Sequence, residues 1–247
     1  RHIEIQVLSD CTGKGVHFGE RDCSIQRRHQ KLLEEAGSPA IDDAKRGELG
    51  TIATRALSRM KYRNAGTLVF LYQDGAFAFI EMNTRLQVEH PVTEMVCGVD
   101  LVREQIRIAA GEMLDYRQED IRFRGHAIEC RINAEDPETF VASPGTVTAL
   151  DLPGGPGVRC DTALYAGASV PPFYDSLIAK LIVHAPSRAE AIARMRRALG
   201  EFNIAGIKTT LPLHRRIIDE QAFRSGDYTI HWLEQTLSAA ASSRECA

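Results

Sequence analysis

Two short runs rich in strand-forming residues, Thr67–Gln73 and Ala76–Met82, flank the dipeptide Asp74-Gly75. An Asp-Gly pair between two such runs is typical of a β-hairpin, because this dipeptide accepts the backbone conformation of a tight turn. The pattern therefore predicts an antiparallel pair of strands here. Any fold proposed for the chain has to build a sheet around it.

The periodicity of the apolar residues predicts further elements on both sides of this hairpin. Alternation over residues 2–7 predicts a half-buried strand, and a glycine-containing turn at 10–15 is expected to lead into a second, short strand. Residues 42–60 and 100–110 are expected to be helical, and Asp100 is the expected N-cap of the second helix.

The pattern of predicted elements changes after residues 113–123. This segment is charged and weakly patterned, and we interpret it as a linker. Alternation over 126–133 predicts another strand. Ser187 and Glu190 form a capping box, which predicts the start of a helix. The apolar residues at helical spacing behind it are Ile192, Met195, Leu199 and Phe202. These patterns predict an α+β chain of two parts.

Length, charge and cysteine usage narrow the class of protein. The 247 residues suffice for one large domain or two ordinary ones, and the net charge of −3 gives no overall attraction to nucleic acid or anionic membranes. No stretch approaches the roughly 20 apolar residues of a membrane helix. The six cysteines form no C-x-x-C pair, so we expect reduced thiols and a cytoplasmic protein. Without an initiator Met or an apolar signal core, the chain is expected to begin partway through a larger protein.

Five polar residues alternate with less polar ones after the predicted hairpin: Glu81, Asn83, Arg85, Gln87 and Glu89. If the backbone stays near-extended, all five lie on one side. A carboxylate beside an amide oxygen suits Mg²⁺, an arginine binds planar oxyanions, and a second carboxylate can act as a general base. The same pattern is typical of the polar outer face of an edge strand. The residues alone leave both interpretations open.

Two smaller polar clusters also allow more than one interpretation. The run Gln26–Lys31 is basic, and it suits either phosphate contacts or a solvated basic turn. Arg131 follows Glu129 on the polar face of the strand predicted over 126–133. A surface ion pair, which contributes little to stability, is the simplest interpretation of that pair.

Four segments resemble the biotin carboxylase family. The runs 81–94 and 20–31 are similar to two signatures of these enzymes, and 125–137 and 174–177 are similar to their C-terminal domain. The similarity extends from Arg1 to about Leu237. The resemblance implies the C-terminal part of an ATP-grasp domain over 1–115, a biotin carboxylase C-terminal domain over 124–236 and a tail over 237–247. The N-terminal domain and most of the ATP-grasp lid would lie outside the chain.

The resemblance also implies roles for individual residues. Glu81 and Asn83 match metal-site residues, Glu89 matches the base that deprotonates bicarbonate, and Arg131 matches the residue that stabilises the biotin enolate. The residues that match the bicarbonate site are Arg85, Gln87 and the backbone of Val88. The residues that match nucleotide-contacting positions are His2, Gln26, His29, Leu71 and Ile230, together with Lys31, which matches a position at both the phosphate and bicarbonate.

The implied reaction uses ATP, Mg²⁺ or Mn²⁺, bicarbonate and biotin. Bicarbonate attacks the γ-phosphate of ATP to give carboxyphosphate, which releases carbon dioxide beside the biotin ring. No Met-Lys-Met biotinylation motif occurs in the chain, so biotin is expected on a separate carrier protein or domain. A carboxyltransferase partner and a homodimer are further expectations. We expect no nucleic-acid or membrane partner.

One residue departs from the family pattern. The family hairpin reads Gly-Thr-x-Glu-Phe-Leu, and its Glu is the other principal metal ligand, whereas this chain reads Gly66-Thr67-Leu68-Val69-Phe70-Leu71. If the hairpin loop spans an odd number of residues centred on Gly75, Val69 lies opposite Glu81 and points into the metal site. Valine offers no ligand oxygen, so we expect a sound fold with damaged catalysis.

Three functions therefore compete. The first is the biotin carboxylase reaction, carried out as part of a longer parent protein. The second is a truncated or degenerate carboxylase that keeps the fold without the activity, as Val69 and the missing lid would favour. The third is another ATP-grasp ligase, such as a carbamoyl-phosphate synthetase. The run from Glu129 to Asp136 argues against the third, because it resembles the biotin carboxylase domain.

Overall fold

The computed structural model describes residues 1–245, with side chains described through residue 239. The chain forms two compact units. The first unit contains Arg1–Ser24 and Glu34–Ala127, and the second contains Ile25–Leu33 and the chain from Ile128 onward. The chain therefore passes between the units three times, and each passage falls inside a β-strand. Helices and strands alternate irregularly in both units, which confirms the predicted α+β class.

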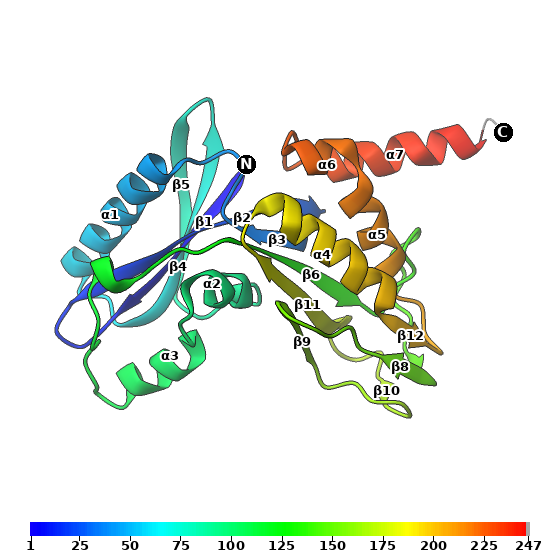
Figure 1. Cartoon of the computed structure of the whole chain (residues 1–247), viewed down its shortest axis with the longest axis horizontal. Coiled ribbons are helices and arrows are strands. Elements are labelled where there is room, and N and C mark those ends of the chain that lie inside the picture. Colours follow the sequence, from blue (N-terminus) through cyan, green and yellow to red (C-terminus); the bar gives the residue numbers. More distant parts are fainter. Residues whose placement is uncertain (246–247) are drawn as a thin grey trace. The chain divides into compact units, whose positions relative to one another are not determined.

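The first unit is built on antiparallel strands in the order β5-β4-β1-β2 (Figure 1). Its elements are β1 His2–Ser9, β2 Gly15–Arg27, β3 Gln30–Ala36, α1 Asp43–Met60, β4 Asn64–Gln73, β5 Ala76–Asn83, α2 His90–Cys97, α3 Leu101–Ala109 and the 3₁₀ helix η1 Gln118–Asp120. Both predicted helices are confirmed, with N-caps Asp42 and Asp100 accepting backbone N–H bonds. The helix α2 was not predicted.

Strand β1 is buried on both faces, so the prediction of a half-buried strand is wrong. Ile3, Ile5 and Val7 pack in an apolar core with residues of α1 and β4. Glu4 and Gln6, on the opposite face, are also fully buried. The predicted alternation is present, but the polar face is covered by other polar groups of the protein rather than by water. The strand after the turn, β2, is 13 residues long rather than short.

The predicted hairpin is confirmed, but its turn differs from the one considered. Gln73 pairs with Ala76, so the turn contains only Asp74 and Gly75, with φ values of 51° and 82°. This even-numbered turn by itself would place Val69 opposite Ile80. A bulge after Val69 adds one residue to β5 and places Val69 opposite Glu81 instead. The expected pairing is therefore confirmed, although its assumed cause is wrong.

The second unit has strands in the order β3-β6-β11-β9. Its elements are β6 His126–Asn133, β7 Gly145–Thr146, β8 Ala149–Asp151, β9 Val158–Thr162, β10 Ser169–Val170, β11 Leu177–Ala185, α4 Arg188–Glu201, β12 Asn203–Ala205, α5 Leu211–Asp219, α6 Gln221–Ser225 and α7 Trp232–Glu245. The predicted helix start is confirmed, because Ser187 is the N-cap and its hydroxyl accepts from the Glu190 N–H. The reciprocal bond of a capping box differs, since the Glu190 carboxylate accepts from the Ser187 hydroxyl rather than from its backbone N–H. Buried Met195 and Leu199 of α4 lie in the core that also holds β11.

The chain ends in α7, which covers much of the segment expected to be a tail, 237–247. The helix is described to Glu245, and residues 246–247 lie outside the described part, including Cys246. The five cysteines in the described part are free thiols. No helix between residues 1 and 245 has both the length and the apolar character needed to cross a membrane.

The hairpin turn gives a test of the register. We expect Gly75→Ala to lower the free energy of unfolding by about 1 kcal/mol, because alanine is disfavoured at positive φ. Space is not the cause, since a Cβ at Gly75 would meet only the Lys45 ammonium at 3.6 Å. Urea denaturation of the chain measures the loss. Asp74→Asn is the matched control, since asparagine accepts positive φ, and an equal loss in both variants would contradict the explanation.

Candidate active site

One face of the first unit's sheet carries the candidate metal residues. In the strand register Val69 pairs with Glu4 on one side and with Glu81 on the other. Asn83 lies two residues along β5, and its amide donates to the Glu81 carboxylate at 3.0 Å. Glu81 and Asn83 thus share a face and offer two oxygens to a cation. Val69, which is 3% exposed, offers none.

The donor set formed by Glu81 and Asn83 meets part of what Mg²⁺ requires. The ion takes oxygen ligands and is usually bound by one or two carboxylates together with substrate phosphates. Glu81 and Asn83 fit such a site, with one carboxylate rather than two. The residues therefore suit an ion that is held largely by a bound phosphate, and Val69 removes the charge that a second carboxylate would supply.

The five polar residues of the candidate row do not share one extended face, so that expectation is wrong. Strand β5 ends at Asn83, residues 84–89 are irregular, and α2 begins at His90. Arg85 is exposed, whereas Gln87 and Glu89 are 6% and 1% exposed. Proline at the first turn of α2 was the missed signal, since its fixed φ and absent N–H suit a helix start.

The turn into α2 is held by its own backbone. The Gln87 carbonyl accepts from the His90 N–H at 3.3 Å and lies 2.8 Å from the His90 Nδ1. Glu89 occupies the N-cap position, but its side chain makes no capping bond. Its carboxylate instead lies 4.0 Å from the Cys23 thiol. The local fold therefore leaves the Glu89 carboxylate turned into the unit rather than used to start the helix.

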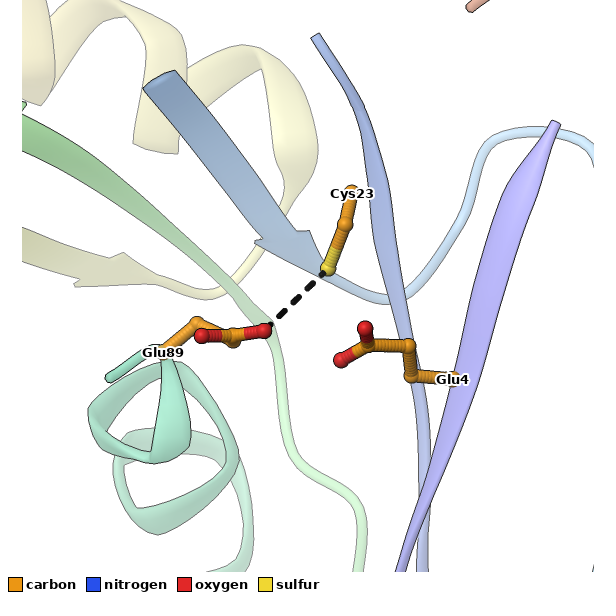
Figure 2. A group of neighbouring side chains, drawn as sticks. All are labelled: Glu4, Cys23 and Glu89. Atoms are coloured by element: carbon orange, nitrogen blue, oxygen red, sulfur yellow. Dashed lines mark hydrogen bonds between the residues drawn. The ribbon is translucent and has the colours of Figure 1, made fainter. Parts of the chain in front are cut away.

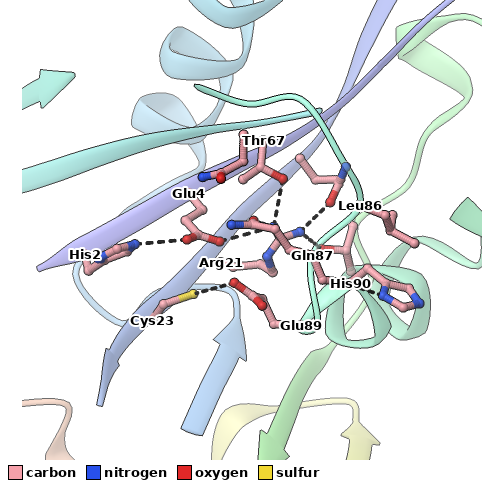
Figure 3. A network of polar contacts seen from close by, with 12 residues as sticks. His2, Glu4, Arg21, Cys23, Thr67, Leu86, Gln87, Glu89 and His90 are labelled. Carbon is pink, nitrogen blue, oxygen red and sulfur yellow. Dashed lines mark hydrogen bonds and ion pairs between the residues drawn. The ribbon is translucent and has the colours of Figure 1, made fainter. Parts of the chain in front are cut away.

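A buried arginine for which the sequence patterns predicted no role lies at the centre of these residues (Figure 3). Arg21, on β2, is fully buried and packs among polar groups of β1, β4, α2 and the segment before α2. Its guanidinium donates to Gln6 Oε1 and Gln87 Oε1 at 2.7 Å, and to Glu4 Oε2, Thr67 Oγ1 and Thr93 Oγ1 at 3.2 Å. The available signal was an arginine in the middle of a long strand.

The side chains of Glu4, Cys23 and Glu89 converge (Figure 2), and their nearest ligand-type atoms lie within 4.8 Å of one another. Burial lowers the pKa of Arg21, but the charges of Glu4 and Glu89 more than offset this effect and raise it. The guanidinium therefore supplies positive charge at this cluster. We assign no metal to it.

Two residues of the first unit match nucleotide-contacting positions, namely His2 and Leu71. They pair with each other across β1 and β4. The His2 Nε2 lies 2.9 Å from the Glu4 carboxylate, and Leu71 is 41% exposed. Leu71 lies on the same sheet face as Val69, so the structure places both residues, with Glu81, on the face that holds Arg21.

The second unit holds the other candidate residues of the basic run. Gln26 lies near the end of β2 and is 7% exposed, and Lys31 lies at the start of β3 and is partly buried. Arg28 and His29 form the turn between these strands, with φ values of 49° and 65°. His29 is exposed there. Ile230 is partly buried in the segment that precedes α7.

Arg131 is on β6, where its backbone carbonyl is held by residues at the start of α5 and within it. The carbonyl accepts from the Thr210 hydroxyl at 3.2 Å and lies 2.6 Å from the His214 Nε2. Glu129, on the same strand, is fully buried, so the interpretation of Glu129 and Arg131 as a surface ion pair is wrong. The reason is the same as for β1, because the polar face of the strand is covered by the protein.

Comparison with known proteins places the chain in a family. Residues 129–235 match the biotin carboxylase C-terminal domain, and residues 1–117 match the ATP-binding domain of the carbamoyl-phosphate synthase large chain. A biotin carboxylase of Pseudomonas aeruginosa is 56% identical over 96% of the chain and 53% of its own length. The chain belongs to the biotin carboxylase family. The second match also bears on the alternative of another ATP-grasp ligase, which the C-terminal match argues against.

Further relatives extend the similarity to different carboxylation systems. A component of the pyruvate carboxylase of Methanothermobacter thermautotrophicus is 54% identical over 95% of the chain and 48% of its own length. A structure of the biotin carboxylase domain dimer of Hydrogenobacter thermophilus 2-oxoglutarate carboxylase, in complex with MgADP, ADP and bicarbonate, has a TM-score of 0.93 at 53% identity. The match covers 95% of this chain and 52% of that one. The chain thus spans about half the length of each of these three relatives.

The buried His214, which contacts the Arg131 carbonyl, gives a test based on the pH dependence of stability. Burial lowers the pKa of His214 to about 4, although its contact with the Arg131 carbonyl raises it. The folded state therefore holds this imidazole neutral, while the unfolded chain protonates it below its ordinary pKa of about 6.5. The stability that the neutral His214 imidazole contributes is fully present above that pKa of about 6.5 and is lost as the pH falls toward 4. We expect His214 to account for a loss of about 2 kcal/mol between pH 7 and pH 5.

Urea denaturation at several pH values measures this loss. His214→Gln is the matched comparison, because glutamine keeps a donor for the Arg131 carbonyl but has no proton to gain. We expect the stability of this variant to fall less steeply with pH. Parallel pH profiles for the two proteins would show that His214 does not titrate on unfolding as argued.

Proposed function

We propose that this chain carries part of a site that carboxylates biotin, with ATP and bicarbonate as co-substrates and carboxyphosphate as the intermediate. The observation that carries the proposal is the arrangement at the start of α2. There an exposed arginine, a buried amide and a buried carboxylate follow one another within five residues, Arg85 to Glu89. This set matches the needs of a small planar anion that must be held and deprotonated.

Each of these residues is given a role by its position. Glu89 is the proposed base, since its side chain is buried and does not cap the helix. Arg85 and Gln87, with the Val88 backbone, are proposed to hold bicarbonate. Arg131 is proposed to stabilise the negative charge of the biotin enolate, because a guanidinium remains charged throughout the working range of pH.

Phosphoryl transfer requires positioned cations more than covalent protein chemistry. Glu81 and Asn83 are the residues proposed to hold Mg²⁺ or Mn²⁺ against the ATP phosphates. Lys31 is proposed to contact phosphate and bicarbonate. The proposed nucleotide contacts are His2, Gln26, His29, Leu71 and Ile230. Biotin is proposed to arrive on a separate carrier protein or domain, as the absence of a biotinylation motif in the sequence supports.

The assembly of the whole protein is part of the same proposal. The Hydrogenobacter relative is described as a dimer, which supports a homodimer here. A carboxyltransferase partner would take the carboxyl group from biotin to its final acceptor. Free cysteines support a cytoplasmic location.

Val69 supports a second candidate, a carboxylase fold with impaired catalysis. It lies directly between Glu4 and Glu81 in the register, where the family pattern has a glutamate. An assay of bicarbonate-dependent ATP hydrolysis with free biotin, on the natural full-length protein, separates the two candidates. Hydrolysis that requires bicarbonate and biotin supports the enzyme, whereas a folded protein without it supports the impaired carboxylase.

We expect Val69→Glu to tighten the binding of Mg²⁺-ATP and to raise ATP turnover. The new carboxylate would lie beside Glu81 and restore the missing negative charge at the cation. Without metal, the same change is expected to lower stability, since a third carboxylate would lie beside Glu4 and Glu81. Calorimetry of Mg²⁺-ATP binding and thermal unfolding with and without Mg²⁺ measure the two effects.

The control is Val69→Gln, which has a similar size to the glutamate variant and no charge. Equal Mg²⁺-ATP affinity in all three proteins would mean that Glu81, Asn83 and phosphate suffice for the metal. Improved binding by both variants would point to an added polar contact rather than to a restored carboxylate ligand.

A further inference from the structure

We propose that Arg21 is a positioning residue that fixes the Gln87 side-chain amide with its NH₂ group turned toward the bicarbonate site. The inference rests on the proposed function for the role of Gln87. The geometry that supports the inference is independent of the proposed function, because it consists of contacts within the first unit. Arg21 touches no proposed substrate and would act through Gln87 alone.

The donor chemistry of Arg21 determines which end of the Gln87 amide faces it. A guanidinium has only N–H donors and no acceptor. The Gln87 atom that lies 2.7 Å from an Arg21 terminal nitrogen must therefore be the carbonyl oxygen. The two ends of an amide are otherwise hard to tell apart, and here the partner decides between them. The NH₂ group must point away from the guanidinium.

That NH₂ group is left for a ligand. Within the described part of the chain, the Gln87 side-chain nitrogen donates to no protein acceptor, while its Oε1 and backbone carbonyl are both engaged. Gln87 lies between Arg85 and Glu89 in the segment that we assign to bicarbonate. An anion there would receive a donor that is already oriented before binding.

The guanidinium is itself held from several sides, so it cannot follow Gln87 if the amide rotates. One terminal nitrogen donates to Gln6 Oε1 and Thr93 Oγ1, and the other to Glu4, Thr67 and Gln87. The Gln6 amide is fixed in turn, because its nitrogen donates to the Val7 and Gly66 carbonyls. A flipped Gln87 amide would set its N–H groups against those of Arg21 and lose the hydrogen bond between them.

The alternative is that Arg21 serves only to hold the elements of the fold together. Its contacts with Glu4, Gln6 and Thr67 serve that purpose. Arg46 provides a matched comparison within the same unit, because it also forks onto a buried carboxylate, Glu20, with a 2.9 Å bond. No described contact joins Arg46 to Gln87. A test must therefore find an effect of Arg21 that Arg46 does not share.

The first test uses the chain itself and needs no activity. We would measure the order of the Gln87 side-chain ¹⁵NH₂ group by NMR relaxation in the wild type, Arg21→Lys and Arg46→Lys. Lysine keeps the charge but lacks the fork. We expect the Gln87 amide to be ordered in the wild type and Arg46→Lys and mobile in Arg21→Lys. An amide that stays equally ordered in a folded Arg21→Lys protein would overturn the proposal.

A second pair of variants leaves Arg21 in place, in case Arg21→Lys does not fold. Gln87→Glu keeps an oxygen for Arg21 but replaces the NH₂ donor with a second acceptor. Gln87→Leu removes both. We expect the melting temperature of Gln87→Glu to stay near that of the wild type while Gln87→Leu melts lower. Equal destabilisation of the two would show that the carbonyl contact with Arg21 does not hold Gln87.

Kinetics on the natural full-length protein complete the test. We expect Arg21→Lys to raise the KM for bicarbonate about tenfold with little change in the KM for ATP, and Arg46→Lys to change neither. In a Gln87→Ala background, Arg21→Lys should add less than about twofold, since its target is gone. Additive effects would contradict the proposal. If even the wild type shows no bicarbonate-dependent hydrolysis, the proposed function fails, while the NMR and melting results still decide the role of Arg21.

Discussion

The first unit is organised around one constraint, the burial of the Arg21 guanidinium. A buried cation is costly unless acceptors surround it. The unit meets this requirement with side chains from β1, β4, the segment before α2 and α2 itself, which fixes these elements against one another. The polar residues on the inner face of β1 follow from the same need, since Glu4 and Gln6 are two of these acceptors.

The hairpin of β4 and β5 imposes a second constraint, because it decides which side chains reach that polar face. In the register set by the two-residue turn, Glu81 would pair with Leu68 and point into the apolar core with it. The bulge at Ile80 shifts the pairing by one residue and turns Glu81 to the face of Val69. With this one extra residue, Glu81 is a candidate metal ligand. Without it, the Glu81 carboxylate would be buried in the apolar core, away from water.

The sequence predicted those features that local periodicity determines. The hairpin, both early helices and the N-cap of α4 were predicted from residue spacing and end signals alone. The burial of the polar faces of β1 and β6 was not, because alternation is the same whether water or protein covers the second face. The prediction of an extended row after Asn83 was wrong for a different reason. It relied on the alternation of polar residues, whereas Pro91 indicated that a helix, α2, starts there.

The partners of Arg21 lay outside what the sequence could indicate, since they come from segments up to 72 residues away. Val69 shows the opposite case, in which the sequence was informative and the structure explains why. Valine suits the centre of a buried strand, and here it separates Glu4 from Glu81, two carboxylates that would repel a third between them. A glutamate at this position therefore depends on a bound cation, whereas valine does not. The fold and the metal site place opposite demands on residue 69, and this chain meets the demand of the fold.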